Sequence, residues 1–314
     1  MENKLIVSTS PHFHGKVTIT GIMRDVLIAL LPATVAAVVF FGFKALLMIC
    51  VCVATAVLSE FLFNLICKKA QTVGDLSAMV TGLLLALSLP TKANLWQCAV
   101  GSVFAIIVVK CLFGGIGCNF ANPAVTSRVF LLIAFGGIAG GSATVFAPVE
   151  LASGATPLEA IANGSGNLPT LIDMLIGNRS GAIGETCAIA LLLGFVYLLI
   201  RRVISWETPV VFIGTVFVLS LLVKQDLMAA LYQVLGGGLL IGAIFMATDY
   251  VTTPINRWGK VVFAFGCGLM TVLIRFWGSY PEGVSFAILF MNILTPYIDS
   301  WTKHRVLVAG GKKS

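Results

Sequence analysis

Charged residues are scarce in this sequence. Asp, Glu, Lys and Arg make up 11% of the 314 residues, whereas an average soluble domain carries roughly a quarter. Apolar residues make up 58%, and the mean hydropathy is +1.01. A chain with so little polar surface cannot cover itself in water, which excludes an ordinary soluble domain. The composition therefore predicts an all-α polytopic membrane protein.

Several motifs of soluble redox enzymes and regulators are also missing. The sequence has no G-x-G-x-x-G turn for a dinucleotide, and its eight cysteines form no C-x-x-C pair for an iron–sulfur cluster or zinc. The net charge of +7 comes from basic residues scattered in pairs between apolar runs, without a basic face that includes aromatic residues. We therefore expect no metal site, no nucleic-acid partner and no NAD site in this chain.

Ten apolar runs divide the chain, and several are shorter than the roughly 17–25 residues of a full membrane span. We expect each run to form one transmembrane helix. The runs are 25–43, 45–66, 76–90, 97–114, 123–140, 183–200, 209–223, 228–247, 260–276 and 283–299. The predicted parts of the chain are a leader (1–24), a first five-helix repeat (25–140), a loop (141–182), a second five-helix repeat (183–299) and a tail (300–314).

Lysine and arginine predict the orientation, because cytoplasmic loops of membrane proteins carry an excess of both. With the N-terminus in the cytoplasm, thirteen basic residues lie inside and four lie in outer loops. The inner group is Lys4, Lys16, Arg24, Lys68, Lys69, Arg201, Arg202, Arg257, Lys260, Lys303, Arg305, Lys312 and Lys313, and the outer group is Lys44, Lys92, Arg179 and Lys224. An even number of spans then leaves both termini cytoplasmic and the loop 141–182 outside.

The two halves of the sequence are similar to each other. "DVLIALL" from Asp25 matches "ETCAIALLL" from Glu185, and "GLLLALSLPTKANLW" matches the later "GLLIGAIFMATDYVTTPINRW". Five helices per half is an odd number, so the second copy is inverted, and such repeats place sites near the midplane at broken helices. We expect breaks in the third and eighth runs, which lead to Pro90 and Pro254, because proline removes a backbone donor. The alternative is that short apolar strings recur by chance.

The predicted outer loop contains the string Ser153-Gly154-Ala155-Thr156. A threonine hydroxyl is a weak nucleophile, but it can accept a phosphoryl group that a separate enzyme delivers. Gly154 and the other small residues allow such an enzyme to approach the backbone closely. Taken alone, the string favours an ordinary turn, because four small residues in a Gly-rich loop are common.

Six motifs give this string a context. They are "SPHFHGKVTITGIMRDVLIALLPA", "VTGLLLALSLP", "GGIGCNFANPA", "SGATPL", "FMATDYVTTP" and "YPEGVSFAILFMN", in this order along nearly the whole chain. With them the sequence resembles the D subunits of Rnf complexes. These complexes are ion-translocating ferredoxin:NAD oxidoreductases, and their D subunits are related to the B subunit of the sodium-pumping NADH:quinone oxidoreductase. The resemblance implies a urea-channel-like fold of two inverted five-helix repeats in the bacterial cytoplasmic (inner) membrane.

The resemblance also implies two flavins. A dedicated flavin transferase, acting outside the cytoplasm, joins FMN through a phosphoester to the threonine of S-G-A-T, which is Thr156 here, with Ser153, Gly154 and Ala155 as the rest of its motif. The transferase prefers an Asp followed by Gly six residues before the threonine, whereas this sequence has Glu150 without a following glycine. A second flavin, riboflavin, is held without a covalent bond nearer the inner side.

The sequence gives no fingerprint for the riboflavin site. The candidates are polar residues near the inner ends of the runs, Asn119, Asn122, Thr248 and Asp249. The alternative is that these side chains satisfy the backbone of broken helices. The resemblance implies that electrons arrive from the flavin-carrying G subunit and cross the membrane through this chain. The other expected partners are the A and E membrane subunits, the NAD-binding C subunit, membrane lipid and Na⁺ or H⁺.

Acidic residues inside membrane spans are costly and are functional candidates by default. The candidates for an ion pathway are Glu60, Asp25, Glu185 and Asp249. Helix N-terminal stabilisation is the alternative for Asp25 and Glu185. We expect Lys110 and Arg128 to pair with acids or with lipid headgroups. The alternative function is a small-solute channel or secondary transporter, or a structural anchor, without a redox cofactor.

Overall fold

A computed structural model describes residues 18–135, 157–162, 169–179, 181–278 and 282–310, and among these residues the secondary structure is helical, without a strand. The predicted all-α fold is therefore confirmed for the described part of the chain. In the first half the helices are α1 (Ile19–Ile66), α2 (Ser77–Ser88), α3 (Leu95–Val103), the π-helix η2 (Phe104–Cys111) and α4 (Pro123–Ala134). Two short helices, α5 (Pro157–Ala162) and α6 (Leu171–Ile176), follow. The second half contains α7 (Ala188–Ile200), α8 (Glu207–Lys224), α9 (Leu227–Leu235), α10 (Leu239–Ile241), the π-helix η3 (Gly242–Met246), α11 (Arg257–Trp277) and α12 (Val284–Gly310).

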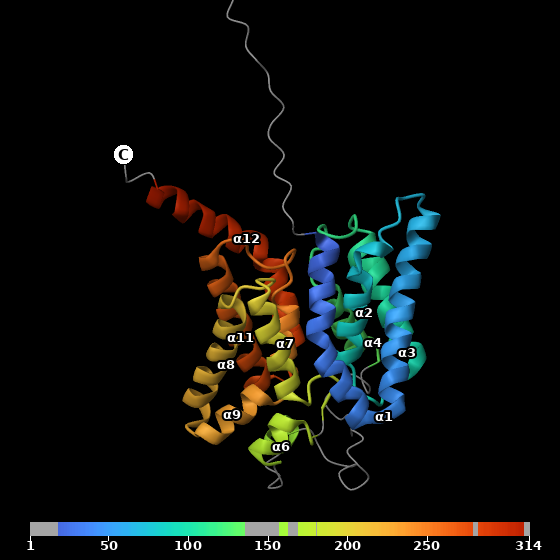
Figure 1. The fold of residues 1–314 in the computed structure, drawn as a ribbon. Helices are drawn as coiled ribbons and strands as arrows, with labels where there is room; N and C mark the ends of the chain where they lie inside the picture. The colour runs from blue at the N-terminus through green and yellow to red at the C-terminus, as the bar shows by residue number, and fades with distance from the viewer. Residues whose placement is uncertain (1–17, 136–156, 163–168, 180, 279–281, 311–314) are drawn as a thin grey trace, which may run out of the picture.

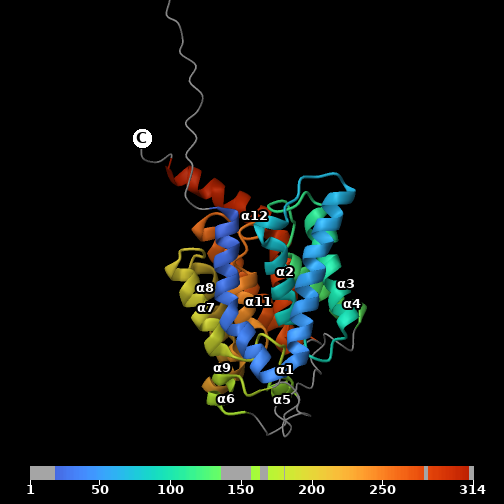
Figure 2. The ribbon, with the colours of Figure 1, turned by 45° about the vertical axis from the view of Figure 1, so that its right-hand side comes forward.

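The helices run between two ends of the molecule (Figures 1 and 2). α1 starts at one end and reverses direction at Gly42, whose φ of 69° and ψ of −155° interrupt the helix. The end where α1 starts also holds the end of α12, whereas α5, α6 and α9 lie at the other end. We call the first the basic end, because its described basic residues are Arg24, Lys68, Lys69, Arg201, Arg202, Arg257 and Lys260. We call the second the loop end.

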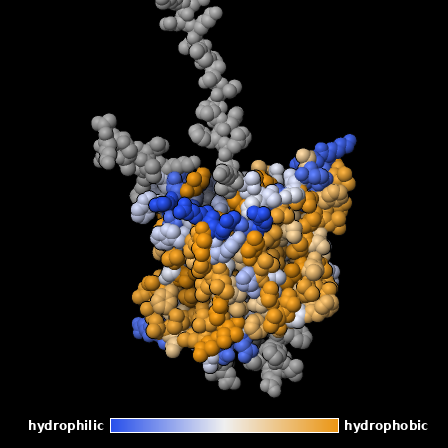
Figure 3. All heavy atoms as spheres, viewed as in Figure 1, coloured by the Kyte–Doolittle hydropathy of each residue, from blue (hydrophilic) through white to orange (hydrophobic). Residues whose placement is uncertain are grey.

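On the face seen in Figure 3, an apolar belt lies below a hydrophilic band at the basic end. By length and composition, three described helices are able to cross a membrane: α1, α8 and α11. The pair formed by α9 and by α10 with η3 meets the same criteria when it is counted as one span, which is bent by 61°. The apolar helices α2, α3 with η2, α4 and α7 are shorter. The fold is thus that of a multi-pass membrane protein, and the count of ten spans stays a prediction.

One predicted boundary is wrong. The first helix starts at Ile19 rather than at residue 25, because Thr18 caps it by accepting a hydrogen bond from the Gly21 amide. The eighth run is broken, as predicted, and its bend lies at the glycines 236–238, whereas Pro254 lies in the irregular segment before α11. Three consecutive glycines supply the backbone freedom for this bend. In the third run, α2 ends at Ser88, two residues before Pro90, as predicted.

The segment before α7 supplies hydrogen-bond donors to the C-terminal end of α2. The amides of Ile183 and Gly184 donate to the carbonyls of Leu89 (3.1 Å) and Leu87 (2.7 Å). A helix that ends away from water needs partners for its last carbonyl groups, and here they come from the other half of the chain. One apolar core accordingly runs through both halves.

Gly194 marks the closest approach of α7 to α1. A Cβ at this position would lie 2.3 Å from the carbonyl oxygen of Ala29, so Gly194→Ala must move α7 away from α1. We expect a loss of about 1–3 kcal/mol of unfolding free energy, measured as a lower thermal midpoint in detergent. Gly214→Ala in α8 is the matched control, since no atom lies within 4 Å of its added Cβ. Equal midpoints for the two variants would contradict the close packing.

Candidate functional site

A cavity of about 340 Å³ lies at the basic end, between the two halves of the chain. Its walls come from the first turns of α1 and α2, the loop before α4, the end of α7 and the segment after η3. The apolar side chains in these walls include Ile22, Met23, Val26, Leu84 and Phe245. Cofactor pockets are typically about 300–1,000 Å³, mostly apolar, with a few convergent polar groups. The volume and the lining fit that description.

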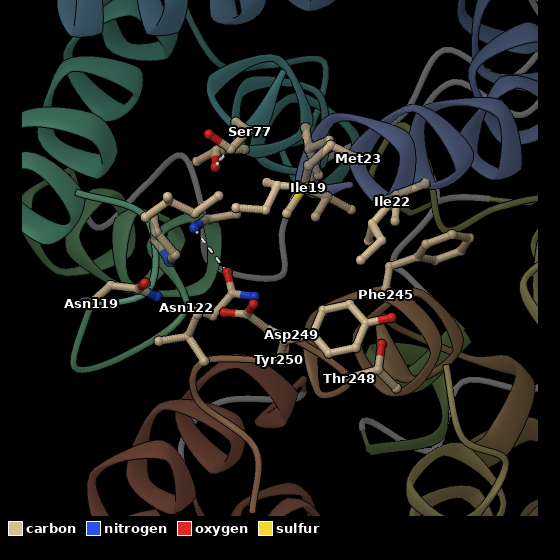
Figure 4. A pocket seen from close by; sticks show the side chains of 18 of the residues that line it. Ile19, Ile22, Met23, Ser77, Asn119, Asn122, Phe245, Thr248, Asp249 and Tyr250 are labelled. Carbon is tan, nitrogen blue, oxygen red and sulfur yellow. Dashed lines mark hydrogen bonds between the residues drawn. The ribbon is translucent and has the colours of Figure 1, made fainter. Parts of the chain in front are cut away.

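All four residues that the sequence singled out for riboflavin line this cavity (Figure 4). Asn119 and Asn122 come from the loop before α4, and Thr248 and Asp249 come from the segment after η3. These two segments are more than a hundred residues apart in the sequence. The folded chain therefore brings polar groups of both halves to one apolar pocket.

Asn122 connects the halves through hydrogen bonds. Its side-chain oxygen accepts from the amides of Ala124 (3.0 Å) and Val125 (3.3 Å), which caps α4, and its nitrogen donates to the carbonyl of Met246 (3.1 Å) at the end of η3. Pro123 at the first helical position favours a helix start here, because its fixed φ suits the helix and its missing amide needs no partner. Asn122 thus satisfies the backbone of a broken helix and also lines the cavity.

The other three candidates also bond within the walls. Asn119 donates to the carbonyl of Ala121 (3.0 Å), and Thr248 donates to that of Ile244 (2.6 Å). Asp249 accepts from the hydroxyl of Thr252 (3.2 Å). Backbone satisfaction, the alternative that the sequence left open, is therefore present, and it holds these side chains in place around the cavity.

Glu60 forms a buried ion pair beside the cavity. Lys110 of η2 donates to Glu60 Oε1 (2.8 Å) and to the hydroxyl of Ser77 (2.6 Å), and Thr72 donates to the same carboxylate oxygen (2.6 Å). Lys110 and Ser77 line the cavity, so the pair is part of its wall. Glu60 is 1% exposed, and its second oxygen, Oε2, has no partner. The expectation that Lys110 pairs with an acid is confirmed.

The ion-pathway candidates do not form one site. Glu60 and Asp249 lie at the cavity, whereas Glu185 lies in the segment before α7, which bonds to the far end of α2. Asp25 is the seventh residue of α1, beyond its first turn, and accepts from Tyr197 (3.2 Å) and Arg201 (3.2 Å) of the α7 region. Asp25 therefore does not stabilise the N-terminus of α1. Its hydrogen bonds instead join α1 to α7.

Ser153, Gly154, Ala155 and Thr156 lie outside the described residues. The chain is described again from Pro157, where α5 starts. Leu158 in α5 is 3% exposed and packs against the glycines at the bend between α9 and α10. The chain that directly follows the threonine is thus attached to the loop end.

A second, smaller cavity was not anticipated from the sequence. It has a volume of about 200 Å³, shares Thr248 and Tyr250 with the larger one, and is lined by hydroxyl groups such as those of Thr208 and Thr253. Lys260 donates to Ser205 in its wall (2.9 Å). Isolated hydroxyl residues give no signal in a sequence, and only folding brings these segments together.

The Lys110–Glu60 pair gives a stability prediction. Lys110→Met removes the cation and leaves a buried, unpaired carboxylate, so we expect a loss of about 3–5 kcal/mol of unfolding free energy. The double variant Lys110→Met with Glu60→Gln removes both charges and should recover most of that loss. Thermal unfolding of the three proteins in detergent measures the difference. If the double variant is no more stable than the single one, the two groups do not interact as described.

Comparisons with known proteins place the chain in a family. A family model described as the NQR2, RnfD, RnfE family matches residues 6–308. The chain is 43% identical over 309 residues to the D subunit of the Na(+)-translocating ferredoxin:NAD(+) oxidoreductase complex of Acetobacterium woodii, covering 97% of this chain and 96% of that protein. It is 38% identical over 321 residues to the D subunit of the proton-translocating ferredoxin:NAD(+) oxidoreductase complex of Clostridium ljungdahlii, covering 96% of each. It is 37% identical to the D subunit of the ion-translocating oxidoreductase complex of Stutzerimonas stutzeri, covering 90% of each. The chain therefore belongs to the NQR2, RnfD, RnfE family.

Proposed function

We propose that this chain is the flavin-carrying D subunit, embedded in the membrane, of an ion-translocating ferredoxin:NAD oxidoreductase complex. The observation that carries the proposal is the cavity at the basic end, where Asn119 and Asn122 of one half meet Thr248 and Asp249 of the other. The names of the relatives support the assignment to such a complex. Within the complex, the G, A, E and C subunits are the expected neighbours.

FMN is proposed to be attached through a phosphoester to Thr156, with Ser153, Gly154 and Ala155 as the motif of the transferase. The support is the S-G-A-T string, together with the attachment of Leu158 at the loop end. The cavity lies at the opposite end of the molecule, so the two proposed flavin positions lie toward opposite sides of the apolar belt. Bound flavins would supply one- or two-electron transfer, and the chain would position them for passage across the membrane.

Riboflavin is proposed to occupy the 340 Å³ cavity. The apolar walls suit a flat ring system, and the amide of Asn119 and the carboxylate of Asp249 offer hydrogen-bonding groups at one edge. The adjoining 200 Å³ cavity, with Thr208 and Thr253, suits a hydroxylated chain. Lys110 places a positive charge in the wall, held by Glu60 and Ser77.

The proposed topology has ten spans in two inverted repeats, with both termini in the cytoplasm. Asn94 and Asn256, which the repeat aligns, are the N-caps of α3 and α11, with φ and ψ of −77° and 148° in one and −77° and 147° in the other. α3 starts toward the loop end and α11 starts at the basic end (Figure 1). The same local structure thus starts helices of opposite direction, as an inverted repeat requires. The basic end is proposed to face the cytoplasm.

The proposed ion pathway includes Glu60, Asp249, Asp25 and Glu185. The relatives are named for different ions, Na⁺ in Acetobacterium woodii and protons in Clostridium ljungdahlii. Among the four acids, Glu60 has the strongest support, since it is buried, paired with Lys110 on one oxygen and without a partner on the other. A carboxylate oxygen of this kind is available to a passing cation.

The covalent flavin is tested on a denaturing gel. Chain from its native host should give a band that fluoresces under ultraviolet light, and Thr156→Val should abolish it, because the acceptor hydroxyl is gone. Thr144→Val in the same loop is the control and should keep the band. A dark wild-type band would contradict the covalent flavin and would favour a solute channel or secondary transporter.

The second flavin is tested by filling the cavity. Met23→Trp adds bulk to the wall, and we expect the purified protein to lose most of the flavin that denaturation releases, while the fluorescent gel band persists. Val39→Trp is the matched control on the same helix, since Val39 is 73% exposed in the apolar belt. If Met23→Trp releases as much flavin as the control, riboflavin binds elsewhere.

A further inference from the structure

The wall of the 340 Å³ cavity contains two charged side chains among the described residues. Lys110 comes from η2 in the first half of the chain, and Asp249 comes from the segment after η3 in the second half. The other described side chains of the wall are apolar or uncharged. A ligand in this cavity therefore meets one cation and one carboxyl group, each from a different half of the chain.

Hydrogen bonds hold Lys110 as a donor on two sides. Ser77 donates its hydroxyl proton to Asp75 Oδ1, so the Ser77 oxygen accepts from Lys110 Nζ (2.6 Å). Glu60 Oε1 accepts from Lys110 Nζ (2.8 Å) and from the hydroxyl of Thr72 (2.6 Å). Both contacts place acceptors around Nζ, and this arrangement suits an ammonium group.

One donor of Lys110 remains for a ligand. An ammonium group carries three N–H donors, and Lys110 makes two hydrogen bonds within the described part of the chain. Lys110 lines the cavity, whereas Glu60, whose side chain is 1% exposed, does not. The positive end of the pair therefore faces the cavity, and the negative end lies behind it.

This placement distinguishes the pair from the other ion pairs of the described residues. Three further pairs are present, and none of their members lines the cavity: Arg128 with Glu282, Arg201 with Asp25, and Arg257 with Glu207. A charge in a mostly apolar wall acts on a neighbouring ligand more strongly than a charge at the surface, because little water screens it. Of the paired cations, Lys110 is therefore the best placed to act on a ligand in the cavity.

We propose that Lys110 raises the reduction potential of the flavin in the cavity. Reduction adds two electrons and one proton to the neutral oxidised ring system and gives an anion; the electrons come from the preceding electron carrier of the complex, and the proton comes from water. A cation in the wall stabilises this anion more than the neutral oxidised form, so it favours reduction. The inference rests on the proposed function, because it requires a flavin at this place.

Redox titration of the flavin held in the cavity tests the proposal. The purified full-length chain carries Thr156→Val in every sample, so that the proposed covalent flavin does not contribute to the signal. Lys110→Met with Glu60→Gln removes both charges of the pair. We expect at least a tenfold loss of preference for reduced over oxidised flavin, which is a fall of about 30 mV in the two-electron midpoint. Glu60→Gln alone leaves the lysine charge uncompensated and should shift the midpoint upward.

Two controls separate charge from packing. Lys110→Arg keeps the positive charge in the wall, so its midpoint should stay above that of the double variant. Asp25→Asn with Arg201→Met removes an ion pair that joins α1 to α7 and lines no part of the cavity, so it should leave the midpoint unchanged. A merely structural role of the Lys110 pair would lower the thermal unfolding midpoint of the double variant without moving its reduction potential.

The outcomes separate this inference from the flavin assignment. Equal midpoints in the Thr156→Val parent and the double variant, with flavin bound in both, overturn the role of Lys110 and leave the flavin assignment standing. A parent protein that releases no flavin on denaturation rejects the flavin in the cavity and this inference with it. If the double variant alone loses its flavin, Glu60→Gln decides, and a midpoint that does not rise above the parent overturns the proposal.

Discussion

The structure depends on one constraint, that backbone groups of interrupted helices must find partners inside an apolar molecule. In lipid no water is available to them, so each unsatisfied group is expensive. In this chain, each half supplies hydrogen bonds to the other. The amides of Ile183 and Gly184 donate to the last carbonyls of α2, and the side chain of Asn122 donates to the last carbonyl of η3. The two breaks therefore hold the halves together.

The cavity is a consequence of the same bonds. Asn122 caps α4 and reaches the end of η3, which places the loop before α4 opposite the segment after η3 and leaves a mostly apolar space between them. Side chains fixed by backbone hydrogen bonds, such as Asn119 and Thr248, lose little further freedom when a ligand binds. Backbone satisfaction and ligand binding are therefore compatible uses of these residues.

Buried charge is concentrated toward the two ends of the molecule. Glu60 and Lys110 stand at the cavity, and the buried Arg128, Arg179 and Glu185 stand at the loop end, with an apolar core between them. Each group contains a carboxylate oxygen without a hydrogen-bond donor, on Glu60 and on Glu185. Burial of such an oxygen costs free energy, which the packing of the surrounding helices must offset.

The sequence by itself determined the class of protein, the helical content and the polar segments of interest, because composition, apolar runs and motifs are local properties. It located the end of α2 before Pro90, and it singled out Asn119, Asn122, Thr248 and Asp249. Only the tertiary structure decided that these four share one cavity and that Lys110 pairs with Glu60. Only the structure located the bend of the eighth run at its glycines. Such contacts join residues from distant parts of the chain. No local sequence pattern indicates which segment supplies the hydrogen-bond partners of which interrupted helix.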